Sequence, residues 1–381
     1  MALPERSSIL TSAQPSPVSR PLPDGVPQLV DAVTGAVDMP RRRAIAKAIT
    51  LLESTRPDHR AQADALLAAL LPHAGHAFRL GLSGVPGVGK STLIEALGLH
   101  LIARGHHVAV LTIDPSSAVS GGSILGDKTR MEHLSVHPDA YIRPSPSSGN
   151  LGGVAEKTRE SILVLEAAGY DVVIVETVGV GQSEVAVAGM TDMFVLMQLP
   201  NAGDELQAIK KGVMELADLV LINKADLDPD AATRAQAQIT SSLRLIGQHG
   251  NPAHAQHDIE QWTPRVLQLS ALSGQGVQAL WDAALEFRTK QSRLARWDAR
   301  RRRQALSWMW ERIESGLRQA FRDDMAVKEQ LARMSDEVAQ GRMVASTAAR
   351  ELLALFGRHL PGAASAQPGT LPPASGAGAT P

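Results

Sequence analysis

The sequence predicts an α/β fold in which a mainly parallel β-sheet is covered by helices on both faces. Between residues 77 and 288, short apolar runs alternate with amphipathic segments, which is the pattern of parallel strands joined by helices. Before and after this region, apolar residues recur at three- and four-residue steps, as they do in helices. We therefore expect a central α/β domain with N-terminal and C-terminal helical extensions. The predicted strands are residues 78–83, 107–113, 171–176, 193–199, 218–223 and 265–269.

The parts of the chain follow from composition and periodicity. Residues 1–30 are rich in proline and serine, so we expect a disordered leader. Residues 31–76 carry apolar residues at helical spacing, and Pro57 divides them into two helices. Residues 289–360 return to a helical apolar pattern after the α/β domain of residues 77–288. The last part, residues 361–381, contains five prolines among small or neutral side chains, so we expect a disordered tail.

The loop after the first predicted strand carries a phosphate-binding motif. Residues 84–91 match G-x-x-x-x-G-K-[ST] between an apolar run and a helix-like segment, the context that the motif needs in a P-loop NTPase. Small residues let backbone N–H groups turn inward around phosphate oxygens, and the helix N-terminus adds its positive end. Lys90 can reach the β- and γ-phosphates and is predicted to be catalytic, while the Ser91 hydroxyl can ligate Mg²⁺. The predicted phosphate-binding residues are Gly84, Val85, Pro86, Gly87, Val88, Gly89, Lys90, Ser91 and Thr92.

Two further motifs predict that the bound nucleotide carries guanine. Asn223, Lys224 and Asp226 form an N-K-x-D motif directly after an apolar run. The Asp226 carboxylate can accept two hydrogen bonds from the ring N–H and amino group of guanine, a donor pair that adenine lacks. The three motifs in this order predict that GTP is the substrate. A backbone contact to the guanine carbonyl is expected from the turn after the next strand, Ser270, Ala271 and Leu272.

Carboxylates between these motifs are the candidate ligands of Mg²⁺. The strand at residues 171–176 ends on Glu176, where a nucleotide-binding sheet brings a carboxylate to the metal. Many GTPases have aspartate there, and the longer Glu176 side chain leaves direct ligation and ligation through water both open. Asp114 and Asp127 are further candidates, although aspartate also serves as a turn residue or helix cap. The predicted metal set is Ser91, Asp114, Asp127 and Glu176, with Glu176 also predicted to act in catalysis.

The residue after Gly179 predicts slow turnover. Ras-like GTPases place a water-orienting glutamine there, whereas this chain has Val180, and the nearest glutamine is Gln182. We therefore expect slow intrinsic hydrolysis of GTP that depends on a partner or on a rearranged loop. Which residue positions the attacking water stays open.

Composition narrows the function classes. The chain has 38 basic and 39 acidic residues, a balance that argues against wrapping nucleic acid or binding an anionic membrane. It has no cysteine, which excludes disulfides, thiolate metal sites and cysteine nucleophiles. No apolar run approaches the ~20 residues of a membrane span. We expect a cytoplasmic protein with neither nucleic-acid nor membrane partners, and whether residues 1–30 are a targeting segment stays open.

Taken together, the motifs resemble those of the MeaB/ArgK group of GTPases, which are associated with methylmalonyl-CoA mutase. The resemblance covers about residues 40–355 and is most specific in residues 176–184 and 198–205, ETVGVGQSE and QLPNAGDE. It implies a dimeric GTPase, related to the metallochaperone GTPases, that gates cofactor loading and protects an adenosylcobalamin-dependent acyl-CoA mutase. It also implies dimerisation through residues 289–360. We do not expect the chain to bind cobalamin directly.

The resemblance further implies switch loops at residues 114–127, 176–184 and about 198–211. Coupling of the nucleotide state to the mutase is expected from Gln182, Asp204, Lys210 and Lys211, although the two lysines could equally form an exposed helix face. Two alternatives from other classes remain: a kinase or transport ATPase, which N-K-x-D disfavours, and a metallochaperone, which the lack of cysteine disfavours. Methylmalonyl-, ethylmalonyl- and isobutyryl-CoA mutases all remain possible partners.

Overall fold

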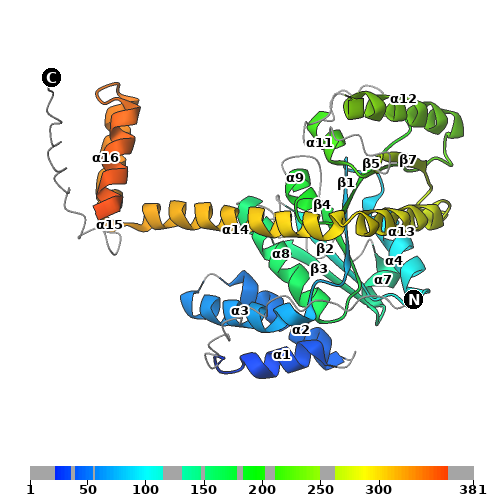
Figure 1. Ribbon diagram of the computed structural model, residues 1–381, viewed down its shortest axis with the longest axis horizontal. Helices are drawn as coiled ribbons and strands as arrows, with labels where there is room; N and C mark the ends of the chain where they lie inside the picture. The colour runs from blue at the N-terminus through cyan, green and yellow to red at the C-terminus, as the bar shows by residue number, and fades with distance from the viewer. Residues whose placement is uncertain are drawn as a thin grey trace, which may run out of the picture. The chain divides into compact units, whose positions relative to one another are not determined.

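The computed structural model describes residues 22–35, 39–54, 56–114, 131–146, 151–177, 183–201, 211–248 and 262–358. Its centre is one seven-stranded sheet in the order β3-β2-β4-β1-β5-β6-β7, and every neighbouring pair is parallel. The predicted α/β class is confirmed (Figure 1). The strands are β1 (Phe78–Gly84), β2 (Val108–Asp114), β3 (Ala140–Pro146), β4 (Val172–Thr177), β5 (Met193–Gln198), β6 (Leu219–Ile222) and β7 (Arg265–Gln268).

Helices cover both faces of this sheet. One face packs against α4 (Lys90–Ile102), α7 (Glu132–Val136) and α13 (Val277–Arg293). The opposite face packs against α8, α9, α11 and α12, which span Leu151–Ala167, Ser183–Ala188, Lys211–Leu216 and Pro229–Gln248. Both faces of the strands are apolar because both are buried, as in other parallel sheets.

Strand β3 was not among the predicted strands. It pairs with β2 from Val108↔Ala140 to Asp114↔Pro146 and lies at the outer position of the sheet. Its sequence contains Pro144 and Pro146, and proline cannot donate to a ladder of hydrogen bonds. Proline is tolerated here because an outer strand has a partner on one side only. The two prolines therefore conceal this strand in the sequence, although they are compatible with its place at the edge of the sheet.

Three N-terminal helices pack beside one another and against α8 (Figure 1). They are α1 (Val26–Thr34), α2 (Met39–Glu53) and α3 (Pro57–Leu70), and the short 3₁₀ turn Leu71–His73 follows. Helix α1 begins within the residues predicted as a disordered leader. The local sequence favours this helix, because a proline lies in its first turn and apolar residues spaced three and four positions apart are buried.

The chain divides into two compact units, residues 1–300 and residues 301–381. The second unit contains most of α14 (Arg296–Asp323), all of α15 (Met325–Ala339) and all of α16 (Ala345–Arg358). A small core joins α15 and α16, and Phe321 meets Phe356 edge to face with ring centroids 5.6 Å apart. Within the described part of the chain, no helix is long and apolar enough to cross a membrane.

Candidate functional site

The predicted phosphate loop joins the carboxyl end of β1 to the start of α4. Lys90 is the first residue of α4 and is buried, with 8% of its surface exposed. Its Nζ donates to the carbonyl oxygens of Gly84 at 2.8 Å and Val85 at 3.3 Å. Among the described residues, no side chain caps the N-terminus of α4, which leaves its first backbone N–H groups available to an anion. The loop therefore gathers one ammonium group and a helix terminus.

Two glycines allow this loop to pack closely. Gly89 has φ 97°, a left-handed conformation, and a Cβ atom there would collide with the side-chain amide of Asn223. A Cβ atom on Gly84 would lie 2.7 Å from the carbonyl oxygen of Met197 on β5. Glycine at both positions thus allows close contact with β5 itself and with Asn223, directly after β6.

Asn223, the first residue of the N-K-x-D motif, joins the three predicted nucleotide motifs. Its side chain is buried, and its Nδ2 donates to the carbonyl oxygen of Val88 at 2.7 Å. Its Oδ1 accepts from the backbone N–H of Ala271 at 2.9 Å. The phosphate loop, the motif after β6 and the turn after β7 therefore meet at one amide.

The other predicted base-binding residues lie around this amide. Lys224 has φ 59°, so the chain turns sharply directly after Asn223. Asp226 is exposed, which leaves its carboxylate accessible to a ligand. Ser270 is buried, whereas Leu272 is 88% exposed and projects into solvent. The Asp226 carboxylate is therefore accessible, while the turn after β7 is buried at Ser270 and Ala271 and exposed at Leu272.

The candidate metal ligands are only partly described. Glu176 lies at the carboxyl end of β4 with 4% of its surface exposed, paired in register with Leu82 of β1 and Thr112 of β2. Ser91, in the first turn of α4, is half-buried. Asp114 is the last residue of β2, but its side chain and the whole of Asp127 lie outside the described residues.

The described donors fit Mg²⁺. A buried carboxylate is stable only when positive charge or hydrogen-bond donors compensate it, and Mg²⁺ prefers the hard oxygen donors that Glu176 and Ser91 offer. Within the described residues, no group of three His, Asp or Glu side chains forms a metal site by itself.

The predicted coupling residues fall mostly outside the described part of the chain. Gln182, Asp204 and Lys210 are outside it, as are Gly179 and Val180. Lys211 begins α11, and its side chain is not described. The expected role of these residues in relaying the nucleotide state stays a prediction.

Buried polar residues that were not predicted also gather at the carboxyl edge of the sheet. Thr177 donates its hydroxyl to Ser83 at 2.8 Å, and both side chains are fully buried. Thr112 and Gln198 are each 1% exposed, and neither side chain has a hydrogen-bond partner within the described residues. A polar residue at the end of a buried strand is the sequence signal that would have found them.

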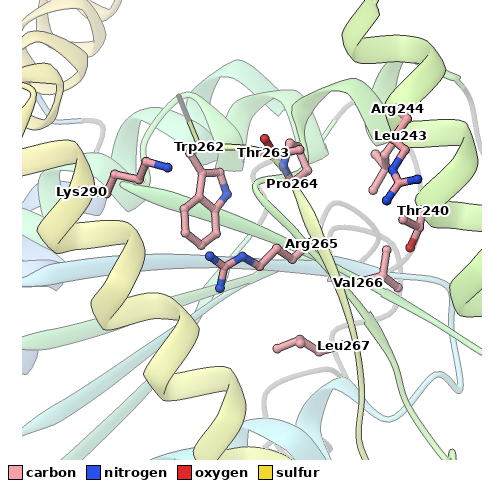
Figure 2. A pocket seen from close by; sticks show the side chains of 10 residues that line it. All are labelled: Thr240, Leu243, Arg244, Trp262, Thr263, Pro264, Arg265, Val266, Leu267 and Lys290. Carbon is pink, nitrogen blue, oxygen red and sulfur yellow. The ribbon is translucent and has the colours of Figure 1, made fainter. Parts of the chain in front are cut away.

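A separate cavity of about 390 Å³ lies between α12, β7 and α13 (Figure 2). Trp262 is fixed there, since its Nε1 donates to the carbonyl oxygen of Asp218 at 2.8 Å and Arg265 lies 4.7 Å over its ring. Arg265 is at the amino end of β7, whereas the predicted base-binding turn follows the carboxyl end. None of the predicted nucleotide-binding residues lines this cavity.

Known proteins resemble the chain over most of its length. The family model described as methylmalonyl-CoA mutase-associated GTPase MeaB matches residues 45–326. A probable GTPase of Mycobacterium tuberculosis is 51% identical over 325 residues, which are 85% of this chain and 94% of that protein. The mouse protein named methylmalonic aciduria type A homolog, mitochondrial, is 43% identical over 350 residues, 89% of this chain and 82% of that protein.

Two further comparisons concern the alternative prediction, a kinase or transport ATPase. The GTPase ArgK of Escherichia coli is 47% identical over 274 residues, 72% of this chain and 80% of that protein. A crystal structure described as an LAO/AO transport system kinase matches with a TM-score of 0.67 and 34% identity. The match covers 87% of this chain and 97% of that structure.

Proposed function

The chain belongs to the MeaB family of methylmalonyl-CoA mutase-associated GTPases, and on that premise we propose that it serves an adenosylcobalamin-dependent acyl-CoA mutase as a GTP-driven chaperone. As a GTPase it hydrolyses GTP to GDP and phosphate. The proposal for its nucleotide site is carried by one observation: the Asn223 amide contacts both the phosphate loop and the turn after β7.

The nucleotide lies at the carboxyl edge of the sheet in this proposal. Residues 84–92 hold the phosphates, and Lys90 exchanges its contacts with loop carbonyls for contacts with phosphate oxygens. Asn223 and Lys224 support the guanine ring, and Asp226 accepts from the two donors of its edge. Residues 270–272 provide a backbone donor to the guanine carbonyl. ATP is disfavoured because its base would face the Asp226 carboxylate with an acceptor.

Ser91, Asp114, Asp127 and Glu176 would hold a magnesium ion at the bound nucleotide. Such an ion would supply positive charge to offset the negative charge on the transferring phosphoryl group. Lys90 adds a second positive charge at the same phosphate, and burial strengthens that attraction because water is excluded. Val180 offers no side chain that could orient water, so hydrolysis by the isolated protein is slow.

The mutase partner is the finer part of the proposal. The family name and the mouse relative both connect related proteins with methylmalonyl-CoA metabolism, which favours methylmalonyl-CoA mutase over its ethylmalonyl and isobutyryl counterparts. Nucleotide state would gate cofactor loading and protect the mutase from inactivation, with Gln182, Asp204, Lys210 and Lys211 as the coupling residues. The chain itself would bind no cobalamin, and the complex would be cytoplasmic.

The protein would act as a homodimer through its C-terminal helices. Four apolar residues of α14 recur at three- and four-residue steps and are 40–59% exposed, Leu306, Trp310, Ile313 and Leu317. A helix with such a face in water is normally covered by a partner. A second copy of the same chain is the partner that the family resemblance favours.

Two measurements test this function. GTP turnover is measured with the isolated protein and again with purified methylmalonyl-CoA mutase, and we expect the mutase to accelerate it. Competition of unlabelled ATP and GTP for the bound nucleotide separates a GTPase from the kinase alternative. Tighter binding of ATP would overturn the guanine assignment, and a mutase that neither binds nor stimulates the protein would overturn the chaperone assignment.

A further inference from the structure

Thr112 is a buried polar residue beside the candidate metal site. Only 1% of its surface is exposed, and its hydroxyl has no hydrogen-bond partner within the described residues. A buried hydroxyl without a partner is unfavourable, because water would hydrogen-bond it in the unfolded chain. Such a group in a native structure needs an explanation, and a role at a functional site is one.

The sheet register places Thr112 next to Glu176. The two residues are paired between β2 and β4, so their Cα atoms lie about 5 Å apart. The residues two positions earlier on these strands, Val110 and Ile174, are buried in the core that contains α4. Since side chains alternate along a strand, Thr112 and Glu176 lie on the sheet face that α4 covers, and the phosphate loop leads into the start of that helix.

The Glu176 carboxylate is an acceptor on the neighbouring strand, at the position paired with Thr112. Strand β2 pairs with β3 on one side and β4 on the other, so its backbone carbonyls are used by the sheet. A rotation about χ1 can bring the threonine hydroxyl toward a carboxylate on the neighbouring strand, since cross-strand pairs have Cβ atoms about 5 Å apart. Thr112 can therefore act on Glu176 without any movement of the backbone.

We propose that Thr112 is a positioning residue that donates its hydroxyl to Glu176 when Mg²⁺ and GTP are bound. One carboxylate oxygen is then held by Thr112, and the other is directed at the metal or at a water on the metal. The hydroxyl gains a partner only in the ligated state, so its hydrogen bond favours that state. This inference rests on the proposed GTPase site and names a further residue of it.

The test compares Thr112→Val, which keeps the shape and removes the hydroxyl, with Thr112→Ser, which keeps the hydroxyl. Binding of a fluorescent GTP analogue is titrated with Mg²⁺ for each protein. We expect Thr112→Val to need about tenfold more Mg²⁺, a factor that corresponds to ~1.4 kcal/mol, and Thr112→Ser to resemble wild type. Without nucleotide, Thr112→Val should melt at a higher temperature than wild type, because an unpartnered hydroxyl has been removed.

Thr158→Val is the matched control. Thr158 is equally buried, but its hydroxyl donates to the carbonyl oxygen of Val154 at 2.8 Å within α8. This variant should melt lower and keep the wild-type Mg²⁺ requirement. Thr112→Ala also lacks the hydroxyl and must share the raised Mg²⁺ requirement if Thr112→Val folds poorly. If Thr112→Val and Thr112→Ala need no more Mg²⁺ than wild type to bind the nucleotide, the proposed role of Thr112 is overturned. If the wild-type protein binds the nucleotide equally well with and without Mg²⁺, the proposed metal site itself is overturned.

Discussion

At the scale of single residues, Lys90 shows how the loop is prepared for an anion. Its ammonium group is buried and held by two backbone carbonyls of its own loop, at 2.8 and 3.3 Å. These two contacts keep the charge within the loop. A phosphate group can replace the carbonyls as a stronger, charged acceptor.

Replacing Lys90 by alanine should therefore abolish hydrolysis and leave the fold intact. The charge acts on the transferring phosphoryl group, and no described neighbour could supply it instead. We expect turnover to fall by at least ~100-fold, with a circular dichroism melt close to that of wild type. Turnover near the wild-type rate would contradict the assignment of the phosphate loop.

The exposed Asp226 leads to a second prediction at this scale. Asp226→Asn turns one of the two acceptors of the side chain into a donor, which faces a donor of guanine. We expect GTP binding to weaken by about 2–4 kcal/mol and xanthosine triphosphate to become the better ligand. Titration calorimetry with the two nucleotides checks both effects, and unchanged affinity for GTP would show that Asp226 does not read the base.

At the scale of elements, a charged cluster attaches α3 to α8. Arg60 of α3 forms an ion pair with Glu156 at 2.6 Å and approaches Glu160 at 3.8 Å, while Lys157 approaches Glu160 at 3.2 Å. Burial raises the pKa of Glu160 above its ordinary value of 4.5, and the two cations only partly oppose this. The contact between α3 and α8 therefore includes a carboxyl group, Glu160, that is harder to ionise in the folded protein than in the unfolded chain.

This shift predicts a pH dependence of stability. The folded state binds the Glu160 proton more tightly than the unfolded state, so stability falls as the pH rises from about 4.5 through the raised folded pKa. Glu160→Gln removes this dependence. The melting temperature of the variant relative to that of wild type should therefore increase as the pH rises. Glu329→Gln, at an exposed position, is the control. A difference between Glu160→Gln and wild type that does not change with pH would contradict the prediction.

The elements also show what could be predicted from sequence. Six strands were predictable because buried parallel strands are continuously apolar. The three sequence motifs were also recognisable, and the structure brings them together at the Asn223 amide, although their contacts with a nucleotide stay a prediction. Strand β3 was not, since Pro144 and Pro146 suit only an outer strand, and sequence does not reveal strand order. The role of Thr112 was equally hidden, because its neighbour Glu176 is set by register and not by spacing along the chain.

At the scale of the whole molecule, the second unit has little core of its own. Only four of its described apolar residues are buried, whereas the exposed face of α14 includes Trp310 and Leu317. A unit of this kind gains stability when a partner covers its apolar face. The proposed homodimer would provide that cover through a symmetric interface.

Trp310→Glu should accordingly separate the dimer into monomers. A charge placed at the centre of an apolar interface loses its hydration, and loss of the buried indole removes about 2 kcal/mol or more from association. Sedimentation velocity checks the oligomeric state, and nucleotide binding should be unaffected. Arg318→Ala, a change at a position 76% exposed, is the control that should remain dimeric. A wild-type protein that sediments as a monomer would contradict the proposed dimer.

The single amide of Asn223 has a consequence for nucleotide exchange. Because the same side chain holds Val88 of the phosphate loop and Ala271 of the base turn, it links the two parts of the proposed nucleotide site. A partner that displaced the base turn would remove one of the two hydrogen bonds that fix this amide, which would weaken the support of the phosphate loop and favour release of GDP. Asn223→Ala should thus release GDP faster than wild type in a chase experiment, whatever its rate of hydrolysis.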